Sequence, residues 1–361
     1  LDISALADVE PLKKMRSRDL RNMGRFSQPM IRHAGDVGFT AITWDEAIQV
    51  IVDKIKSTLP DRTYYYLTSR GIPNETYYAF QKAVRAMGTN NVDNAARICH
   101  SPSTFGLKSA LGVAATTCSY SDVIGTDVVT FFGSNVANNQ PVMMKYLYHA
   151  KKAGTKIVVV NPYREPGMDK YWIPSDVESA IFGTQMTDHF FQVQAGGDMA
   201  FLHGTIKHLI DQNAYDSDFI AAYTAGFDDL KNYLENLTWE DLEQNAGLSR
   251  DDMQAYANLI AAADKAVFVW GMGVTQHVTG EDNVHAIINL ALMKGFVGRE
   301  GCGLMPIRGH SGVQGGAEMG AYATVLPGGN DITDANVQQL SAQYGFDVPT
   351  TTGLTTPEML E

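Results

Sequence analysis

Cysteine is scarce in this chain: Cys99, Cys118 and Cys302 are the only three among 361 residues. No two of them form a CxxC pair, so they build no disulfide framework, zinc ribbon or ordinary iron–sulfur site. Such sparing use of cysteine fits a reducing compartment, and we expect a cytoplasmic protein. The first residues also lack the charged start and apolar segment of a secretory signal.

The sequence also has few positively charged residues and no long apolar runs. Lys and Arg number 28 against 40 Asp and Glu, a net charge of −12. This deficit argues against broad contact with nucleic acid or anionic membrane, which requires basic surface. No long uncharged apolar stretch is present to span a bilayer. We therefore expect neither nucleic acid nor membrane as a partner, and the length favours two globular domains.

What the sequence does contain is an alternation of helices and short apolar strands. Strands that are mostly apolar are predicted at 128–132, 156–160 and 266–270. Because they do not alternate polar and apolar residues and are separated by helices, they predict a parallel sheet covered on both faces. The fold class is therefore α/β. Shorter strands are predicted at 64–67 and 91–94, and an irregular, glycine-rich end from 301 onward.

The helices of this alternation are marked by caps and by apolar spacing. Thr43 and Glu46 form a capping box that predicts a helix start, and Ser249 with Asp252 resembles a second one. Further helices are predicted at about 74–87, 140–153 and 281–293, and over much of 198–262.

Small-residue turns follow three of the strands. They are Gly133-Ser134-Asn135, Asn161-Pro162 and Gly271-Met272-Gly273. Ligands of open α/β sheets bind at the carboxyl ends of strands, where backbone N–H groups and helix dipoles favour phosphate. None of the turns is a GxGxxG or Walker A motif, which disfavours plain NAD or ATP and favours a larger phosphate-bearing cofactor. The alternative is that these turns need Gly and Asn for their own geometry alone.

Cys99 and His100 stand just before a predicted helix. A thiolate near a helix N-terminus has a lowered pKa, and it binds soft metals or acts as a nucleophile, while a histidine moves protons near neutral pH. The alternative is a buried cysteine beside a hydrogen-bonded histidine. Arg308, in a glycine-rich loop, has the fork that binds carboxylate or phosphate, unless it is an ordinary surface arginine.

Five segments of the sequence carry a combined signal: 96–102, 132–135, 160–162, 270–276 and 306–310. Taken in this order, they resemble the molybdopterin oxidoreductases of the dimethyl-sulfoxide-reductase superfamily, and among them the formate dehydrogenase alpha-subunit-like group. The resemblance extends from about residue 24 to residue 320. It implies a bis-molybdopterin-guanine-dinucleotide cofactor whose molybdenum or tungsten is held by four dithiolene sulfurs and one protein ligand.

The resemblance also implies roles for single residues. Cys99 falls on the metal ligand, His100 on the proton acceptor, and Arg308 on the arginine that orients a small oxyanion such as formate. His310 stands where the formate-oxidising relatives carry Gln, and Asn161 replaces a usual Asp. The cofactor contacts implied in this way are Arg97, Gly133, Ser134, Asn135, Asn138, Asn161, Pro162, Arg164, Gly196, Asp198, Gly271, Met272, Gly273, Gln276 and Gly309.

For the fold, the resemblance implies two Rossmann-like αβα domains. Residues 1–19 would be an arm left from an iron–sulfur subdomain, 20–94 with 311–361 a discontinuous and partial domain II, and 95–310 the molybdopterin-binding domain III. The family's C-terminal β-barrel domain and the cysteines of its [4Fe–4S] cluster are lacking, so we expect part of a longer enzyme.

The function expected on this basis is the catalytic-subunit core of an oxidoreductase that removes two electrons from formate or a related small oxyanion. Its partners would be that oxyanion substrate and an electron-transfer subunit. The alternatives are a non-catalytic module that binds nucleotide or pterin, and an inactive apo fragment.

Overall fold

Five parallel strands form one sheet that carries most of the buried core. The structure, a computed structural model, describes residues 1–361. The strands predicted at 128–132, 156–160 and 266–270 are confirmed and occupy the three central positions. Two edge strands were not predicted. The expectation of an irregular chain from 301 onward is wrong at the edge strand Gly303–Pro306 and at the helices Val313–Glu318, Asp334–Tyr344 and Thr356–Leu360. In sheet order the strands are β11 (Gly303–Pro306), β10 (Ala266–Trp270), β5 (Val128–Phe132), β6 (Lys156–Val160) and β9 (His189–Phe191).

Helices cover both faces of this sheet, as the uninterrupted apolar strands predict. Successive side chains of a strand point to opposite faces, so Val128 and Phe132 face one helical layer while Val129 and Phe131 face the other. All five residues of β5 are buried. Strands buried on both sides in this way are typical of parallel α/β sheets, where each face needs its own helical cover.

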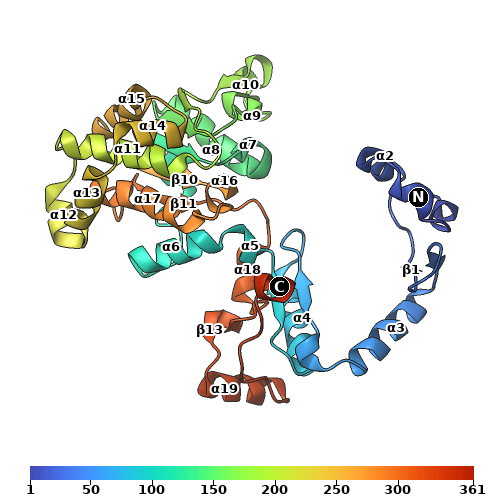
Figure 1. Ribbon diagram of the computed structural model, residues 1–361. Coiled ribbons are helices and arrows are strands. Elements are labelled where there is room, and N and C mark those ends of the chain that lie inside the picture. Colours follow the sequence, from blue (N-terminus) through green and yellow to red (C-terminus); the bar gives the residue numbers. More distant parts are fainter.

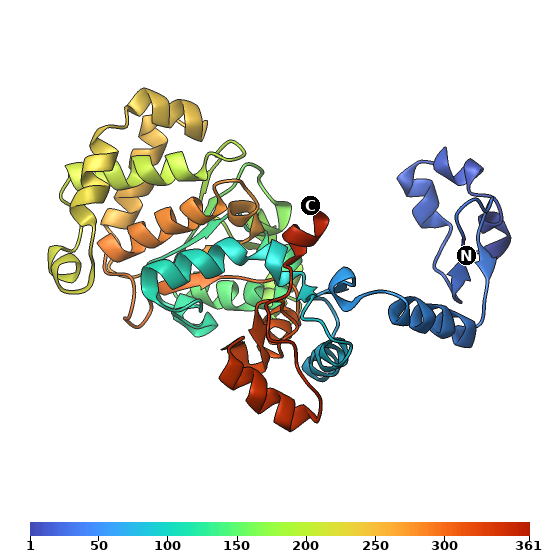
Figure 2. The same cartoon turned by 60° about the horizontal axis from the view of Figure 1, so that its bottom comes forward.

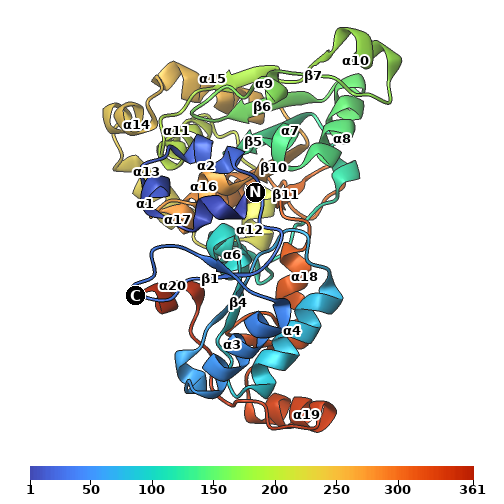
Figure 3. The same cartoon turned by 90° about the vertical axis from the view of Figure 1, so that its right-hand side faces the viewer.

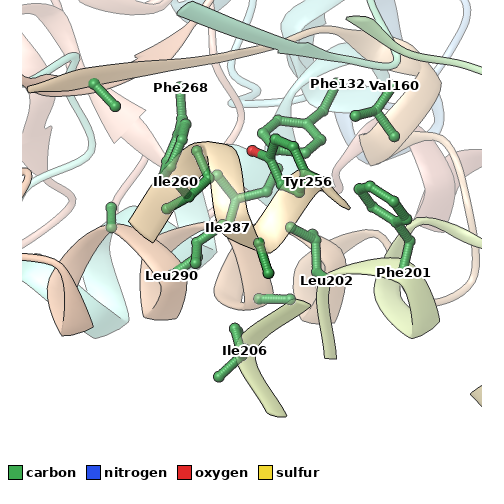
Figure 4. Packing of buried hydrophobic residues seen from close by; sticks show 14 of the residues in the cluster. Phe132, Val160, Phe201, Leu202, Ile206, Tyr256, Ile260, Phe268, Ile287 and Leu290 are labelled. Carbon is green, nitrogen blue, oxygen red and sulfur yellow. The ribbon is translucent and has the colours of Figure 1, made fainter. Parts of the chain in front are cut away.

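The larger helical layer packs against the Phe132 face through closely fitted aromatic rings. Figure 4 shows Tyr256 between the sheet residue Phe132 and the helix residue Phe201. The rings of Tyr256 and Phe201 are stacked with centroids 5.2 Å apart, and the Tyr256 hydroxyl donates to Thr130 Oγ1 at 3.1 Å. This layer contains α6 (Ser101–Leu111), α11 (Asp198–Asp211), α15 (Arg250–Ala261) and α17 (Gly280–Met293).

The opposite face of the sheet is covered mainly by α8 (Pro141–Lys152), whose Met143, Met144 and Leu147 are fully buried. The predictions of helices at 140–153 and 281–293, and of a largely helical stretch over 198–262, are confirmed. The smaller elements of this unit are η3 (Tyr120–Val123), α7 (Val136–Asn139), α9 (Pro166–Asp169), β7 (Lys170–Tyr171), α10 (Val177–Phe182), β8 (Thr184–Gln185), α12 (Ser217–Tyr223), α13 (Phe227–Glu235), α14 (Trp239–Ala246) and α16 (Met272–Thr275).

A smaller unit joins two segments that are far apart in sequence; Figure 3 shows it below the sheet-containing unit. The buried guanidinium of Arg85 donates to the carbonyls of Gly320 and Val325, and the Asp93 carboxylate accepts from the Thr356 N–H. Its elements are η2 (Pro60–Arg62), β3 (Tyr65–Leu67), α4 (Asn74–Ala86), β4 (Val92–Asn94), α5 (Ala96–Cys99), α18 (Val313–Glu318), β12 (Val325–Leu326), η4 (Pro327–Gly329), β13 (Asn330–Asp331), α19 (Asp334–Tyr344) and α20 (Thr356–Leu360).

Parallel pairing in this smaller unit is limited to β3 and β4. A second αβα domain, and the domain boundaries given above, therefore stay predictions. The predicted helix at 74–87 is confirmed, and so are short strands within 64–67 and 91–94.

The first 56 residues lie apart from both units, as Figures 1 and 2 show. The Thr43–Glu46 capping box is confirmed at the start of the last helix, but none of that helix's residues is buried. None of the helices in the chain combines the length and the apolarity needed to cross a membrane. The elements of this segment are η1 (Ile3–Leu6), α1 (Glu10–Lys13), α2 (Ser17–Asn22), β1 (Met30–Ile31), β2 (Thr40–Ala41) and α3 (Trp44–Lys56).

Candidate cofactor site

The loops after β5 and β10 meet at the point where the strand order reverses. From β5 the chain adds β6 and β9 on one side, and it then returns to place β10 and β11 on the other. Ligands of doubly wound sheets bind in the crevice outside the carboxyl ends of the strands at such a reversal. The sheet order therefore predicts a ligand site at the turns that follow Phe132 and Trp270.

Glycine is required where these two turns touch. The Gly273 N–H donates to the Gly133 carbonyl at 3.0 Å, so the two backbones lie in direct contact. A Cβ on Gly133 would lie 2.6 Å from the Val274 backbone nitrogen, and the φ of Gly133 is +54°. The turns that the sequence singled out are thus packed against each other by their backbones.

A cavity of about 380 Å³ opens at this point, and the loops after all five strands contribute to its wall. The cavity extends along the edge of the sheet. Its lining includes the loops after β11 and β6, which are three strand spacings apart and therefore separated by about 14 Å. The predicted site residues that line the cavity are Cys99, His100, Gly133, Ser134, Asn135, Asn161, Pro162, Gly196, Asp198, Gly271, Met272, Gly273 and Gly309.

Five predicted site residues do not line this cavity. The Arg97 side chain pairs with Asp93 at 3.0 Å, and that of Arg164 pairs with Asp169 at 3.1 Å. Arg308 lines an adjoining cavity of about 310 Å³. Gln276 donates from Nε2 to the Ile98 carbonyl at 3.2 Å, and the Asn138 N–H donates to the Asn135 side chain at 3.3 Å.

Sequence reasoning missed eight residues that line the main cavity. Asn139 and Gln140 lie four and five residues after the predicted turn 133–135, and Arg70 lies three residues after the end of β3. A wider search around the strand ends would have included them. His277 follows Gln276, which had been assigned to the cofactor. The full set of missed residues is Arg70, Asn139, Gln140, Glu165, Ala195, His277, Ile307 and His310.

Asp198, the first residue of α11, shows an unmet hydrogen-bonding requirement at one end of the cavity. The residue is 3% exposed and its Oδ1 atom has no hydrogen-bond partner. Burial raises the pKa of this carboxyl to about 6. A buried acceptor left in this way is costly unless a ligand supplies the missing donor. The N–H groups of a guanine base are donors of the kind that could bond to the Asp198 Oδ1 atom.

Cys99 lies on the cavity wall, and its thiol is buried. Burial raises the pKa of this thiol, and the positive charge of Arg308 opposes the rise. The lowered pKa expected for Cys99 is therefore wrong for this chain, because desolvation of the thiolate outweighs the opposing charge of Arg308. A bound soft metal would deprotonate the sulfur regardless of this pKa.

His100, at the start of α6, is 1% exposed, and its Nδ1 lies 3.0 Å from Ser103 Oγ. Burial lowers the pKa of this ring to about 4; Arg308 lowers it further, and a hydrogen bond with the Ile307 backbone opposes both. The imidazole is therefore neutral near pH 7.

No three side chains among His, Cys, Asp and Glu come together as a metal site in the chain. A metal held by the Cys99 sulfur would take its other ligands from a cofactor. A single thiol, backbone-lined turns and an orphaned carboxylate together fit a sulfur-rich metal cofactor that carries a nucleotide.

Comparisons with known proteins show the family to which the chain belongs. The family model for molybdopterin oxidoreductase matches residues 25–359, and the chain belongs to that family. It is 31% identical to Protein YdeP of Escherichia coli K12 over 353 residues, which are 94% of this chain and 46% of that protein. It is 32% identical to formate dehydrogenase H of the same organism over 342 residues, 93% of this chain and 46% of that protein.

These relatives also indicate the subgroup within the family. They support membership of the formate dehydrogenase-like group of the dimethyl-sulfoxide-reductase superfamily. A third, the F420-dependent formate dehydrogenase 2 subunit alpha of Methanococcus maripaludis, is 32% identical over 93% of this chain and 47% of its own length. The chain thus spans about half the length of the curated relatives it matches.

A solved structure shows the same fold. Acetylene hydratase from Pelobacter acetylenicus matches with a TM-score of 0.60 at 19% identity, over 78% of this chain and 37% of that one.

Proposed function

We propose that this chain forms part of the catalytic subunit of a cytoplasmic molybdenum or tungsten oxidoreductase that oxidises formate or a related small oxyanion. The observation that carries the proposal is the main cavity at the sheet reversal, which has both the Cys99 thiol and the orphaned Asp198 carboxylate in its lining. The dinucleotide form of the cofactor is part of this proposal, and Asp198 is the residue that supports it.

The residues present fit one half of bis-molybdopterin guanine dinucleotide, a single pterin with its guanine nucleotide. Asp198 would accept from the guanine N–H groups, the backbones of Gly133 and Gly273 would lie against the pterin or its pyrophosphate, and the Cys99 sulfur would bind the metal. When bound, this cofactor supplies a metal centre that takes up two electrons.

Side chains of the protein would bind the substrate and accept the proton. Oxidation of formate yields carbon dioxide, one proton and two electrons. The guanidinium of Arg308 lies near enough to Cys99 and His100 to shift the pKa of both, and it would hold the carboxylate. The resemblance assigns the proton to His100, whose ring lies at the cavity wall. Electrons would leave through an iron–sulfur cluster and an electron-transfer subunit.

The test is elemental analysis of the purified protein, together with release of guanine nucleotide on acid hydrolysis, after production in cells that make the cofactor. We expect near-stoichiometric molybdenum or tungsten in wild type and in Cys118→Ala, whose thiol lies outside the main cavity, and loss of formate oxidation by Cys99→Ala in the full-length enzyme. Absence of both metals from the wild-type protein would contradict the proposal, and so would a near-normal rate in Cys99→Ala.

A second candidate, a module that binds nucleotide or pterin without redox chemistry, is favoured by the buried, high-pKa thiol of Cys99. Alkylation separates the two candidates. Rapid labelling of Cys99 that cofactor blocks supports the oxidoreductase, whereas an inert thiol in a nucleotide-bound protein supports the module.

A further inference from the structure

We propose that Thr275 is a positioning residue for the Cys99 thiol. Its hydroxyl holds the backbone of helix α5, and it thereby fixes the thiol against the turn that would bind the cofactor. Gln276 acts in the same way from the next position in the chain. The inference rests on the proposed function, because it concerns how the metal ligand is placed; no role was predicted for Thr275 from the sequence.

Helix α5 is too short to satisfy its own carbonyl groups. It spans four residues, Ala96–Cys99, and the Ala96 carbonyl accepts from the His100 N–H at 3.3 Å. The next carbonyl, that of Arg97, accepts from the Ser101 hydroxyl. The last carbonyls of any helix need partners from outside it. The two carbonyls that remain in α5 therefore depend on donors from elsewhere in the fold.

Two successive residues at the end of α16 supply these donors. Thr275 Oγ1 donates to the Cys99 carbonyl at 3.0 Å, and Gln276 Nε2 donates to the Ile98 carbonyl at 3.2 Å. Thr275 is 3% exposed, so water does not compete for its hydrogen bond. The helix that ends in the metal ligand is therefore held at its last two carbonyls by a segment 176 residues away.

The segment that supplies these donors is itself fixed in two places. The Gly273 N–H donates to the Gly133 carbonyl at 3.0 Å, which ties the start of α16 to the turn after β5. Nδ2 of Asn283, a fully buried residue of α17, donates to the Val274 carbonyl at 3.0 Å. The position of Thr275 is therefore set by the sheet on one side and by α17 on the other.

Through α16, the two parts of the protein that must meet one metal are joined. Met272 and Gly273 line the main cavity, where the pterin would lie, and Thr275 binds the helix that ends in Cys99. A metal bonded to both the cofactor and a thiol allows little variation in the distance between them. A sulfur that is held in place beforehand loses less conformational freedom when the cofactor binds. Thr275 supplies this preorganisation.

The alternative is that Thr275 only stabilises the fold, as Thr205 does. Thr205 Oγ1 donates to the Phe201 carbonyl at 2.8 Å within α11, and the residue is fully buried. Both threonines thus donate from a buried hydroxyl to a backbone carbonyl, but only Thr275 donates to the carbonyl of Cys99. Thr205→Val is therefore the matched control for Thr275→Val.

Alkylation of Cys99 in the chain without cofactor tests the positioning role. The chain is labelled with iodoacetamide, and the Cys99 peptide is followed by mass spectrometry. Thr275→Val should accelerate labelling about ten-fold, because a lost buried hydrogen bond loosens α5. Thr275→Ser, which keeps the hydroxyl, and Thr205→Val should label at the wild-type rate. Equal acceleration in both valine variants, or none in Thr275→Val, would overturn the proposal.

Gln276→Met is a second variant, at an exposed position where a change is well tolerated. It removes the donor to the Ile98 carbonyl and should accelerate labelling of Cys99 about two- to three-fold, less than Thr275→Val because water replaces an exposed donor. The same peptide measurement applies. A rate equal to that of wild type would contradict the proposal.

The full-length enzyme gives an independent measurement. Thr275→Val should lower kcat for formate about 10- to 100-fold with KM little changed, because the oxyanion site stays intact while the metal ligand is displaced. Thr275→Ser should restore the rate. A change in KM alone, or no rescue by serine, would contradict the role. The labelling experiment needs no cofactor, so it can fail while metal analysis still supports the proposed function, and the reverse also holds.

Discussion

The sheet-containing unit and the first 56 residues both contain helices with clear local sequence signals, but the helices differ in how much of their apolar surface is buried. Helix α3 has a confirmed capping box, acidic residues in its first turn and lysines in its last, yet Trp44 is 69% and Ile51 57% exposed. Phe201, on α11, is fully buried against the sheet layer. Caps and dipoles start and end a helix, but burial of its apolar face supplies most of its stability. Local signals therefore specify where helices occur and not what they pack against.

The largest expected effect sharpens this comparison directly. Phe201→Ala removes a ring that stacks on Tyr256, and it should lower the free energy of unfolding by about 3–5 kcal/mol. Ile51→Ala, an apolar truncation on the exposed helix, should change it by less than about 0.5 kcal/mol. Urea denaturation of the two variants beside wild type measures both. Similar losses would show that α3 is as well packed as α11.

The second prediction concerns pH. The pKa of the Asp198 carboxyl is about 6 in the folded chain against an ordinary value of 3.8, so the folded state binds this proton more tightly than the unfolded state does. Stability should therefore fall as pH rises from about 4 through 6, by about 3 kcal/mol from this group. Asp198→Asn should match wild type near pH 4 and be more stable at pH 7.5, as urea titrations at both values would show. Equal stability at pH 7.5 would contradict this.

The third prediction compares two glycines that both have a positive φ. Gly133→Ala should cost about 1–3 kcal/mol more than Gly154→Ala, because only the first introduces a Cβ into the contact between the two turns. Both variants carry the strain of a left-handed backbone, which the difference cancels. Thermal and urea denaturation compare them, and an equal cost would mean that the turns separate freely.

The smallest effect is expected in α3. Thr43→Ala removes the cap and should weaken this helix by about 0.5–2 kcal/mol. Hydrogen exchange should accelerate for the amides of α3 and remain unchanged for those of α11. Faster exchange in both helices would show that the two regions unfold together.

Much of the fold could be predicted because the central strands carry their own signal. The residues of β5 and β6 are apolar nearly throughout, and such runs favour a strand buried on both faces. The edge strands β9 and β11 are three and four residues long, and they contain His189, Gly303 or Pro306. Short segments of this composition resemble loops, and only hydrogen bonds to a neighbouring strand make them part of the sheet.

The candidate site divides in the same way. The turns at Gly133 and Gly271 were singled out because strand-end glycines have a local meaning. The surroundings of His100 had no such signal: its partner Ser103 lies one turn along the helix, but Trp270, which donates to Ser103, is 167 residues from that serine. Likewise, the unmet requirement of Asp198 follows from its burial, which depends on the elements that surround it.

The sequence by itself determined where the central strands and most helices lie, which turns contain glycine, and which family motifs the chain carries. These properties depend on residues close together along the chain. Only the tertiary structure decided that five strand ends share one cavity, that His100 Nδ1 lies beside Ser103 Oγ in a buried position, and that His310 Nδ1 and Asp198 Oδ1 have no partner. The physical reason is that burial and hydrogen-bond satisfaction depend on groups brought together by folding across more than a hundred residues.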